Sequence, residues 1–277
     1  MHKWLIVNAD DFGIDRETTD GIIEGHLHGI VSSASAMTNC DQFDYAVNRL
    51  REVPTLRCGV HLNFYQGSPV LPANSIPSLV DPETKRFSSK IHASDSVDPT
   101  DLKAEFRAQI EKFRQFGIEP SHLDNHRPEI YLNYDLFKVV IELAAEFKLP
   151  IRMPFDSAFA TGDQTLSKVS GISWSESQNI GTRVRSDLVR EKIPTPAYFI
   201  YSFTAGERTE LSLLEIIRSL PIGISEICTH PGLRGDRQTT ELGILKSQVI
   251  REAINQNGIR LGSFDLLRFQ QDGHKTH

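Results

Sequence analysis

The 277-residue sequence predicts an α/β barrel of seven or eight mostly parallel strands with helices on its outside. Two observations support this prediction. Short apolar segments alternate with longer segments of helical periodicity, as expected for repeated βα units around a parallel sheet. The chain is also long enough to bury one barrel-sized core, and it contains no internal repeat or low-complexity tract. We therefore expect residues 1–277 to form a single domain.

The strand segments are short enough to be buried between helices, as in a parallel sheet that is covered on both faces. Their number sets the expected size of the barrel. In chain order they are residues 3–8, 32–39, 56–63, 121–125, 150–154, 198–203, 225–230 and 259–264.

The helices are predicted from apolar residues at steps of three or four. Residues 102–116 carry one such apolar stripe, and Gly117 is expected to end this helix. Similar stripes run through residues 136–147 and 242–254, and Asn257-Gly258 is a plausible stop for the latter. We expect these helices to form the outer ring of the barrel.

Two segments interrupt the alternation of strands and helices and are predicted to be loop insertions. Residues 65–97 are rich in Pro, Ser and Asp, and residues 156–182 are rich in Ser, Thr and Gly. Loops of this length often act as lids or binding loops, but composition fits an exposed and merely tolerated insertion equally well. The sequence leaves both interpretations open.

The composition argues against nucleic acids and membranes as partners. The formal net charge is −6, and the basic residues are scattered without the Lys/Arg block expected of a nucleic-acid binder. The apolar segment at residues 4–7 is too short for a signal peptide, and no other stretch approaches membrane-spanning length. We expect a cytoplasmic protein that binds a neutral or weakly charged ligand, and a homodimer is left open.

The three cysteines, Cys40, Cys58 and Cys228, are far apart in the sequence and form no Cys-x-x-Cys motif. An odd number at such spacings suggests neither a disulfide framework nor a zinc ribbon. We expect them to be buried thiols in strands.

Polar residues end four of the predicted strands, at the edge that carries active sites in parallel barrels. They are Asp10, Asp11, His61, Asp124, His126 and His230. An aspartate and two histidines from separate strands form a mixed donor set suited to a divalent metal such as zinc, with positions left for water and substrate. We predict this site at Asp11, His61 and His126. Any one histidine alone is as well explained by a structural hydrogen bond, so the prediction depends on their joint placement.

The adjacent carboxylates of Asp10 and Asp11 cannot point the same way in an extended strand, because side chains alternate between its faces. A turn beginning there would bring both to the rim, so that one can bind metal while the other handles protons. The alternative is a helix-capping role, although Asp15 is also available for that task.

Two further positions are expected to support the site. His122, Asp124 and His126 share one face of a strand, which favours Asp124 as a carboxylate that orients a histidine and His122 as a supporting residue. Arg152 lies in a strand, where a buried guanidinium requires an anionic partner, and Asp10 would provide one. An exposed arginine at the strand end is the open alternative.

The sequence resembles the YdjC-like carbohydrate deacetylases, which include chitooligosaccharide and diacetylchitobiose deacetylases and hopanoid-biosynthesis-associated members. The resemblance covers most of the chain, and its signatures occur in order. They are Asn8-Ala9-Asp10-Asp11-Phe12-Gly13, Gly29-Ile30-Val31-Ser32-Ser33-Ala34-Ser35, Gly59-Val60-His61-Leu62-Asn63, His122-Leu123-Asp124-Asn125-His126, Arg152-Met153-Pro154 and Thr229-His230-Pro231-Gly232.

The resemblance implies a distorted TIM-like barrel with a divalent metal, zinc or magnesium, on Asp11, His61 and His126. It implies removal of an N-acetyl group from an amino sugar or chitooligosaccharide, with Asp10 as the base. In the mechanism that we expect, Arg152 pairs with Asp10, and protonated His230 donates to the departing amine. Many members of the family continue with further histidines after the position of His126, whereas this sequence continues Arg127-Pro128-Glu129. This departure could favour a different or more acidic sugar.

Two other functions fit the same residues. A metal-dependent phosphoesterase would use similar ligands, but the sequence lacks an evident Arg/Lys cluster for phosphate. A non-catalytic sugar-binding protein could keep the ligands after losing turnover. Metal analysis combined with an acetate-release assay separates the three.

Overall fold

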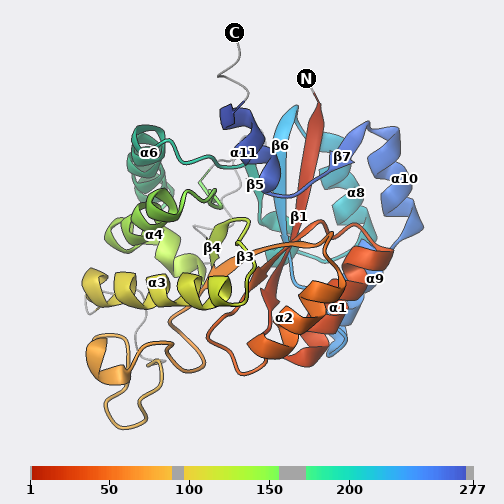
Figure 1. Cartoon of the computed structure of the whole chain (residues 1–277). Coiled ribbons are helices and arrows are strands. Elements are labelled where there is room, and N and C mark those ends of the chain that lie inside the picture. The colour runs from red at the N-terminus through yellow and green to blue at the C-terminus, as the bar shows by residue number, and fades with distance from the viewer. Residues whose placement is uncertain (1, 89–96, 156–172, 273–277) are drawn as a thin grey trace.

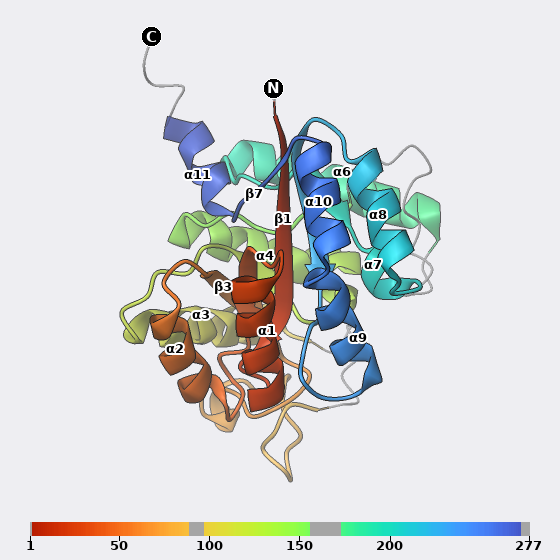
Figure 2. The ribbon, with the colours of Figure 1, turned by 90° about the vertical axis from the view of Figure 1, so that its right-hand side faces the viewer.

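The computed structural model describes residues 2–88, 97–155 and 173–272, and seven parallel strands form one curved sheet in this part of the chain (Figure 1). The strands are β1 (Lys3–Phe12), β2 (Ser33–Ala36), β3 (Arg57–Leu62), β4 (Leu123–Asn125), β5 (Tyr198–Ile200), β6 (Gly223–Thr229) and β7 (Ile259–Leu261). Helices lie around the outside of the sheet in both views (Figures 1 and 2). The predicted α/β distorted barrel is therefore confirmed.

Strand β1 is the centre of the sheet, whose order is β4-β3-β2-β1-β6-β5 with β7 also paired to β1. One edge of β1 pairs with β6 from Lys3 to Ala9. The other edge pairs first with β7, at residues 3–5, and then with β2, from Asn8 onward. All of these pairs are parallel, so the C-terminal ends of the strands meet at one edge of the sheet.

The strand predicted at residues 150–154 is wrong in extent. Only Ile151 forms a bridge, in parallel with Leu123 of β4. Proline occupies both ends of this segment and has no N–H to donate, which limits the ladder that it can form. Backbone bonds from Ile151 to Pro194 and from Arg152 to Leu123 still hold the segment beside β4.

The helices follow the strands in the order that the alternation predicts. The helices are α1 (Arg16–His28), α2 (Phe43–Glu52), α3 (Pro99–Gln115), α4 (Tyr134–Phe147), α6 (Trp174–Glu191), α7 (Ser202–Ala205), α8 (Glu210–Ser219), α9 (Asp236–Leu245), α10 (Gln248–Gln256) and α11 (Asp265–Asp272), with short 3-10 turns at Ala73–Ser75 and Pro128–Leu132. Asp98 caps α3, and Gly117 follows its end with a φ of 76°, as expected for a glycine stop.

The apolar stripe predicted along residues 242–254 crosses two helices, so this prediction is wrong. Helix α9 ends before Lys246, and the side chain of Ser247 starts α10 by accepting a hydrogen bond from the backbone of Val249. A serine cap competes with a continuous helix at this point. Val249 is consequently 48% exposed instead of packing in a stripe.

The two predicted insertions differ in their structure. Residues 65–88 are anchored to α3, because Glu105 accepts backbone hydrogen bonds from Val70 and Leu71, at 2.9 and 3.0 Å. The range predicted for the second insertion, residues 156–182, is too long, because residues 174–182 belong to α6. Residues 89–96 and 156–172 lie outside the described residues.

No helix within residues 2–88, 97–155 and 173–272 combines the length and apolar character needed to cross a membrane. The cytoplasmic location stays a prediction.

Candidate active site

A bulge at the end of β1 presents two adjacent carboxylates to the same side of the sheet. The pairing of β1 with β2 shifts register between Ala9 and Phe12, and Asp11 has a φ of 71°, which is uncommon for a residue other than glycine. As a result, His61 Nε2 lies 3.4 Å from Asp11 Oδ1 and 3.8 Å from Asp10 Oδ2. Asp15, by contrast, caps α1 by accepting from Thr18 N at 2.6 Å. Capping therefore does not explain the pair.

The predicted metal donors converge. Asp11 Oδ1 lies 2.8 Å from His126 Nδ1, and one ligand atom from each of Asp11, His61 and His126 falls within 4.8 Å of the others. The side chains of Asp11 and His126 are 15% exposed, whereas that of His61 is 1% exposed. The donor set is thus buried at His61 and partly exposed at Asp11 and His126, where water and substrate would enter.

Asp124 orients His61 from the neighbouring strand. The two residues are register partners on β3 and β4, and His61 Nδ1 bonds Asp124 Oδ1 at 2.8 Å. This contact leaves His61 Nε2 facing Asp11, the arrangement found for histidines that bind metals in proteins. Burial lowers the pKa of His61, but the carboxylates of Asp124 and Asp10 outweigh it and raise the pKa to about 10. This excess of carboxylates suits a divalent cation, so the residues fit the predicted metal.

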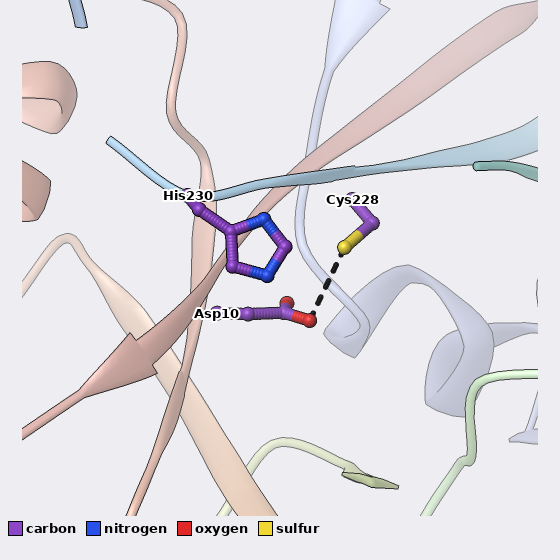
Figure 3. Close-up of side chains that lie close together, drawn as sticks. All are labelled: Asp10, Cys228 and His230. Atoms are coloured by element: carbon purple, nitrogen blue, oxygen red, sulfur yellow. Dashed lines mark hydrogen bonds between the residues drawn. The ribbon is translucent and has the colours of Figure 1, made fainter. Parts of the chain in front are cut away.

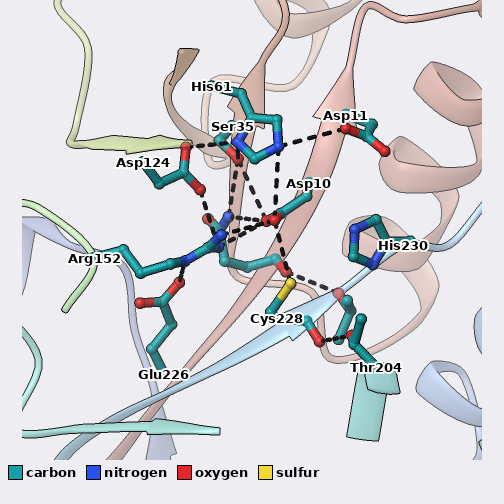
Figure 4. Close-up of polar contacts among 12 residues, drawn as sticks. Asp10, Asp11, Ser35, His61, Asp124, Arg152, Thr204, Glu226, Cys228 and His230 are labelled. Atoms are coloured by element: carbon teal, nitrogen blue, oxygen red, sulfur yellow. Dashed lines mark hydrogen bonds and ion pairs between the residues drawn. The ribbon is translucent and has the colours of Figure 1, made fainter. Parts of the chain in front are cut away.

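Arg152 pairs with Asp10, as one of the two interpretations predicted. Its Nη1 and Nη2 donate to Asp10 Oδ2 and Oδ1 at 2.8 and 2.7 Å, and the side chain is 3% exposed (Figure 4). Arg152 also contacts Asp124 at 3.0 Å and Glu226 at 2.7 Å. Burial raises the pKa of Asp10, yet Arg152 and His61 outweigh it and bring the pKa below its ordinary value. Asp10 is therefore held as a carboxylate, and the exposed-arginine alternative is wrong.

His230 lies on the side of Asp10 that is flanked by β6. Its backbone N–H donates to Glu241 Oε1 at 2.6 Å, which positions the end of β6. In the described part of the chain, the buried Nδ1 of its ring has no hydrogen-bond partner. A cavity opens beside this ring, and its lining includes Asp10, Asn125, His126, Tyr131, Arg152, Phe199, Tyr201, Cys228 and His230.

Several residues of the site were not predicted from the sequence. Asn8 donates to Asp10 Oδ1 at 2.8 Å, Ser35 lies 3.3 Å from His61 Nδ1, and Cys228 donates its S–H to Asp10 Oδ2 at 3.2 Å. Glu226 accepts a hydrogen bond from Arg152 Nε at 2.7 Å. A signal was present for two of them, because Glu226 and Cys228 alternate with His230 along β6 and share its face.

The cysteines are free thiols. Cys58 and Cys228 are buried in strands as predicted, whereas the prediction is wrong for Cys40, which is partly exposed and lies outside the strands. His122 is buried with its ring stacked on Phe264, at a centroid distance of 3.6 Å. It supports the core and lies outside the three donors at Asp11.

The fold and site define a class of protein, a parallel α/β barrel with carboxylate and imidazole donors at the C-terminal ends of its strands. The sequence pattern described as YdjC-like protein matches residues 4–256, so the chain belongs to the YdjC-like family.

Three similar proteins cover nearly the whole chain. A carbohydrate deacetylase of Brevibacillus brevis is 31% identical over 95% of this chain and 99% of its own length. A chitooligosaccharide deacetylase of Proteus mirabilis is 28% identical over 95% of this chain and 98% of its own. The crystal structure of a proposed cellobiose-phosphate cleavage protein from Enterococcus faecalis V583 superposes with a TM-score of 0.80 at 29% identity, over 96% of this chain and 99% of that one.

Proposed function

We propose that this protein is a metal-dependent carbohydrate deacetylase that hydrolyses the N-acetyl group of an amino sugar or chitooligosaccharide and releases acetate. The main support is the convergence of the donors Asp11, His61 and His126 with Asp10, which is held by Arg152. The names of the two deacetylases to which the chain is similar support the same reaction.

Asp11, His61 and His126 would hold a divalent ion, either zinc or magnesium. Two imidazoles and one carboxylate favour zinc among these two ions. When bound, such an ion polarises a carbonyl oxygen and lowers the pKa of a water ligand. Asp124 fixes the orientation of His61 for this purpose.

Asp10 is the proton acceptor in this proposal. Both of its oxygens accept hydrogen bonds from Arg152, and Oδ2, which also accepts from Cys228, faces His61 Nε2 at 3.8 Å. Because Oδ2 is the oxygen that faces a proposed metal ligand, we assign it as the atom that takes the proton of the attacking water. Arg152 keeps Asp10 ionised and fixed in position, so that the carboxylate needs little reorganisation during the reaction.

His230 is the proton donor in this proposal. An amide nitrogen must be protonated to leave, and a positioned imidazole can supply that proton. The bond from its backbone to Glu241 anchors the residue, and its ring lines the cavity beside Asp10.

The test is acetate release from chitooligosaccharides together with metal analysis. Asp10→Asn should keep its metal and lose about 10²–10⁴-fold in kcat, the range expected for removal of a general base. His61→Ala should lose both metal and turnover, because it removes a ligand. The matched control is His28→Ala, at an exposed histidine of α1, and it should change neither. Wild-type turnover in Asp10→Asn would refute the role of Asp10.

A second comparison tests His230. Replacing His230 should slow hydrolysis of an amide much more than that of an activated ester, whose leaving group needs little protonation. Equal slowing of both substrates would contradict the assignment.

The substrate panel separates the rival functions. Release of phosphate from a sugar phosphate would indicate a phosphoesterase, but Arg152 is already shared among Asp10, Asp124 and Glu226 and is poorly placed to bind phosphate. Sugar binding without turnover would indicate a non-catalytic protein. The panel includes acidic sugars, because exposed Arg127 follows His126 and lies over the ring of Tyr65 at 5.6 Å.

A further inference from the structure

Asp10, Cys228 and His230 form a second group of potential metal ligands beside the first. They come from the adjacent strand ends of β1 and β6, where Asn8 pairs with Cys228 and Ala9 with Thr229. This register places Asp10 next to His230, and one ligand atom from each of the three residues falls within 4.8 Å of the others. Figure 3 shows the carboxylate of Asp10 facing both the sulfur of Cys228 and the ring of His230.

Cys228 and His230 keep lone pairs that can bind a cation, whereas both oxygens of Asp10 also accept hydrogen bonds from Arg152. The Sγ–H of Cys228 donates to Asp10 Oδ2 at 3.2 Å, and one ring nitrogen of His230 faces the carboxylate of Asp10 (Figure 3). Bonds of about 2.3 Å to sulfur and about 2.0 Å to oxygen at a tetrahedral angle would put these two atoms about 3.5 Å apart. The present distance of 3.2 Å between Cys228 Sγ and Asp10 Oδ2 is close to this separation, so only a small movement would be needed to bind a cation.

Space and charge also allow a cation. All three residues line one cavity of about 40 Å³, which exceeds the roughly 10–15 Å³ needed for a water. The carboxyl groups of Asp10, Asp124 and Glu226 contact the guanidinium of Arg152; the pKa of Asp10 and of Asp124 lies below the ordinary value, whereas burial raises the pKa of Glu226 to about 8. The positive charge of Arg152 is therefore already compensated from several directions.

We propose that Asp10, Cys228 and His230 bind a thiophilic divalent cation, such as Zn²⁺ in excess or Cd²⁺, at an inhibitory site distinct from that of Asp11, His61 and His126. On binding, the cation takes the place of the thiol proton, which passes to solvent, so that one proton is released and a metal–thiolate bond forms. A thiolate and an imidazole are donors that select zinc-like ions over magnesium. The inhibitory consequence rests on the proposed function, because the cation would occupy both the proton acceptor Asp10 and the proton donor His230.

The experiment is a Cd²⁺ titration of protein that has first been loaded with one equivalent of Zn²⁺. Ultraviolet absorption from thiolate-to-cadmium charge transfer reports only a cadmium–sulfur bond, and acetate release is recorded on the same samples. We expect the absorption to saturate at one further equivalent and the acetate rate to fall with it. Cys228→Ser keeps a hydroxyl donor toward Asp10 but should lose the absorption, whereas Cys40→Ser and Cys58→Ser, the matched controls, should keep it.

The possible outcomes separate the two proposals. Absorption that persists in Cys228→Ser, or inhibition of the wild type without any absorption, would overturn the second site. Absorption in a protein that releases no acetate even before Cd²⁺ is added would keep the metal site and overturn the deacetylase assignment. If Cys228→Ser does not fold, His230→Gln serves instead, and full wild-type Cd²⁺ affinity in that variant would also overturn the site.

Discussion

Asp124 contacts both His61, a proposed metal ligand, and Arg152, the partner of Asp10. Its replacement by asparagine tests the proposed organisation of the metal ligands. Its Oδ1 contacts His61 Nδ1 at 2.8 Å, and its Oδ2 contacts Arg152 Nη2 at 3.0 Å. The residue is buried, so water cannot substitute for either contact. Asparagine has almost the same shape but only one acceptor oxygen.

The size of the effect follows from this loss of one acceptor. The amide oxygen can face His61 or Arg152, and the amide NH₂ then faces the other donor. A buried donor left without an acceptor costs about 1–3 kcal/mol. If His61 is the donor that loses its partner, metal affinity should fall about 10–100-fold, as for other residues that orient metal ligands. This loss corresponds to about 1.4–2.8 kcal/mol of binding free energy.

The assay is competition for Zn²⁺ against a chromogenic chelator, with the free energy of unfolding measured separately by denaturant. Asp265→Asn is the matched control, because Asp265 pairs with Arg57 at the opposite end of β3 and should leave zinc affinity unchanged. A folded Asp124→Asn protein with the wild-type zinc affinity would refute the reasoning.

Three further substitutions test the packing and electrostatics around the site. Gly59→Ala should lower the free energy of unfolding, measured with denaturant, by about 1–3 kcal/mol, because its Cβ would lie 2.6 Å from the backbone oxygen of His122. Gly243→Ala is the control in the same experiment, because its methyl group meets nothing within 4 Å. Asp15→Ala should cost about 0.5–2 kcal/mol through loss of the α1 cap, and an unchanged denaturation midpoint would contradict this. Arg152→Met should cost about 3–5 kcal/mol by leaving buried carboxylates unpaired, and thermal unfolding at neutral pH without a large loss would contradict the ion-pair account.

The convergence of Asp11, His61 and His126 could be predicted from the sequence because the C-terminal ends of parallel strands share one edge of a sheet. This rule and the positions of their strands were sufficient to predict that His61 and His126 lie at this edge. Glu226 could have been found too, since a carboxylate within an apolar strand requires a partner. Ser35 carried no such signal, because a buried serine has little effect on the pattern of a strand.

Some helix boundaries could likewise be predicted from the sequence, and others could not. Gly117 follows the end of α3 as predicted, since a glycine stop depends on residues within one turn of the helix end. The break between α9 and α10 was missed, because periodicity continues through Ser247 even though its side chain caps a new helix.

The sequence by itself determined the alternation of strands and helices and the polar residue types at the strand ends, because both depend on neighbours along the chain. Only the tertiary structure decided that the carboxylates of Asp10 and Asp11 both lie beside His61, since this depends on a bulge against β2 and on the left-handed backbone of Asp11. It also decided which carboxylates share Arg152. These contacts join residues more than 20 positions apart in sequence, and their distances follow from sheet register, which local periodicity does not specify.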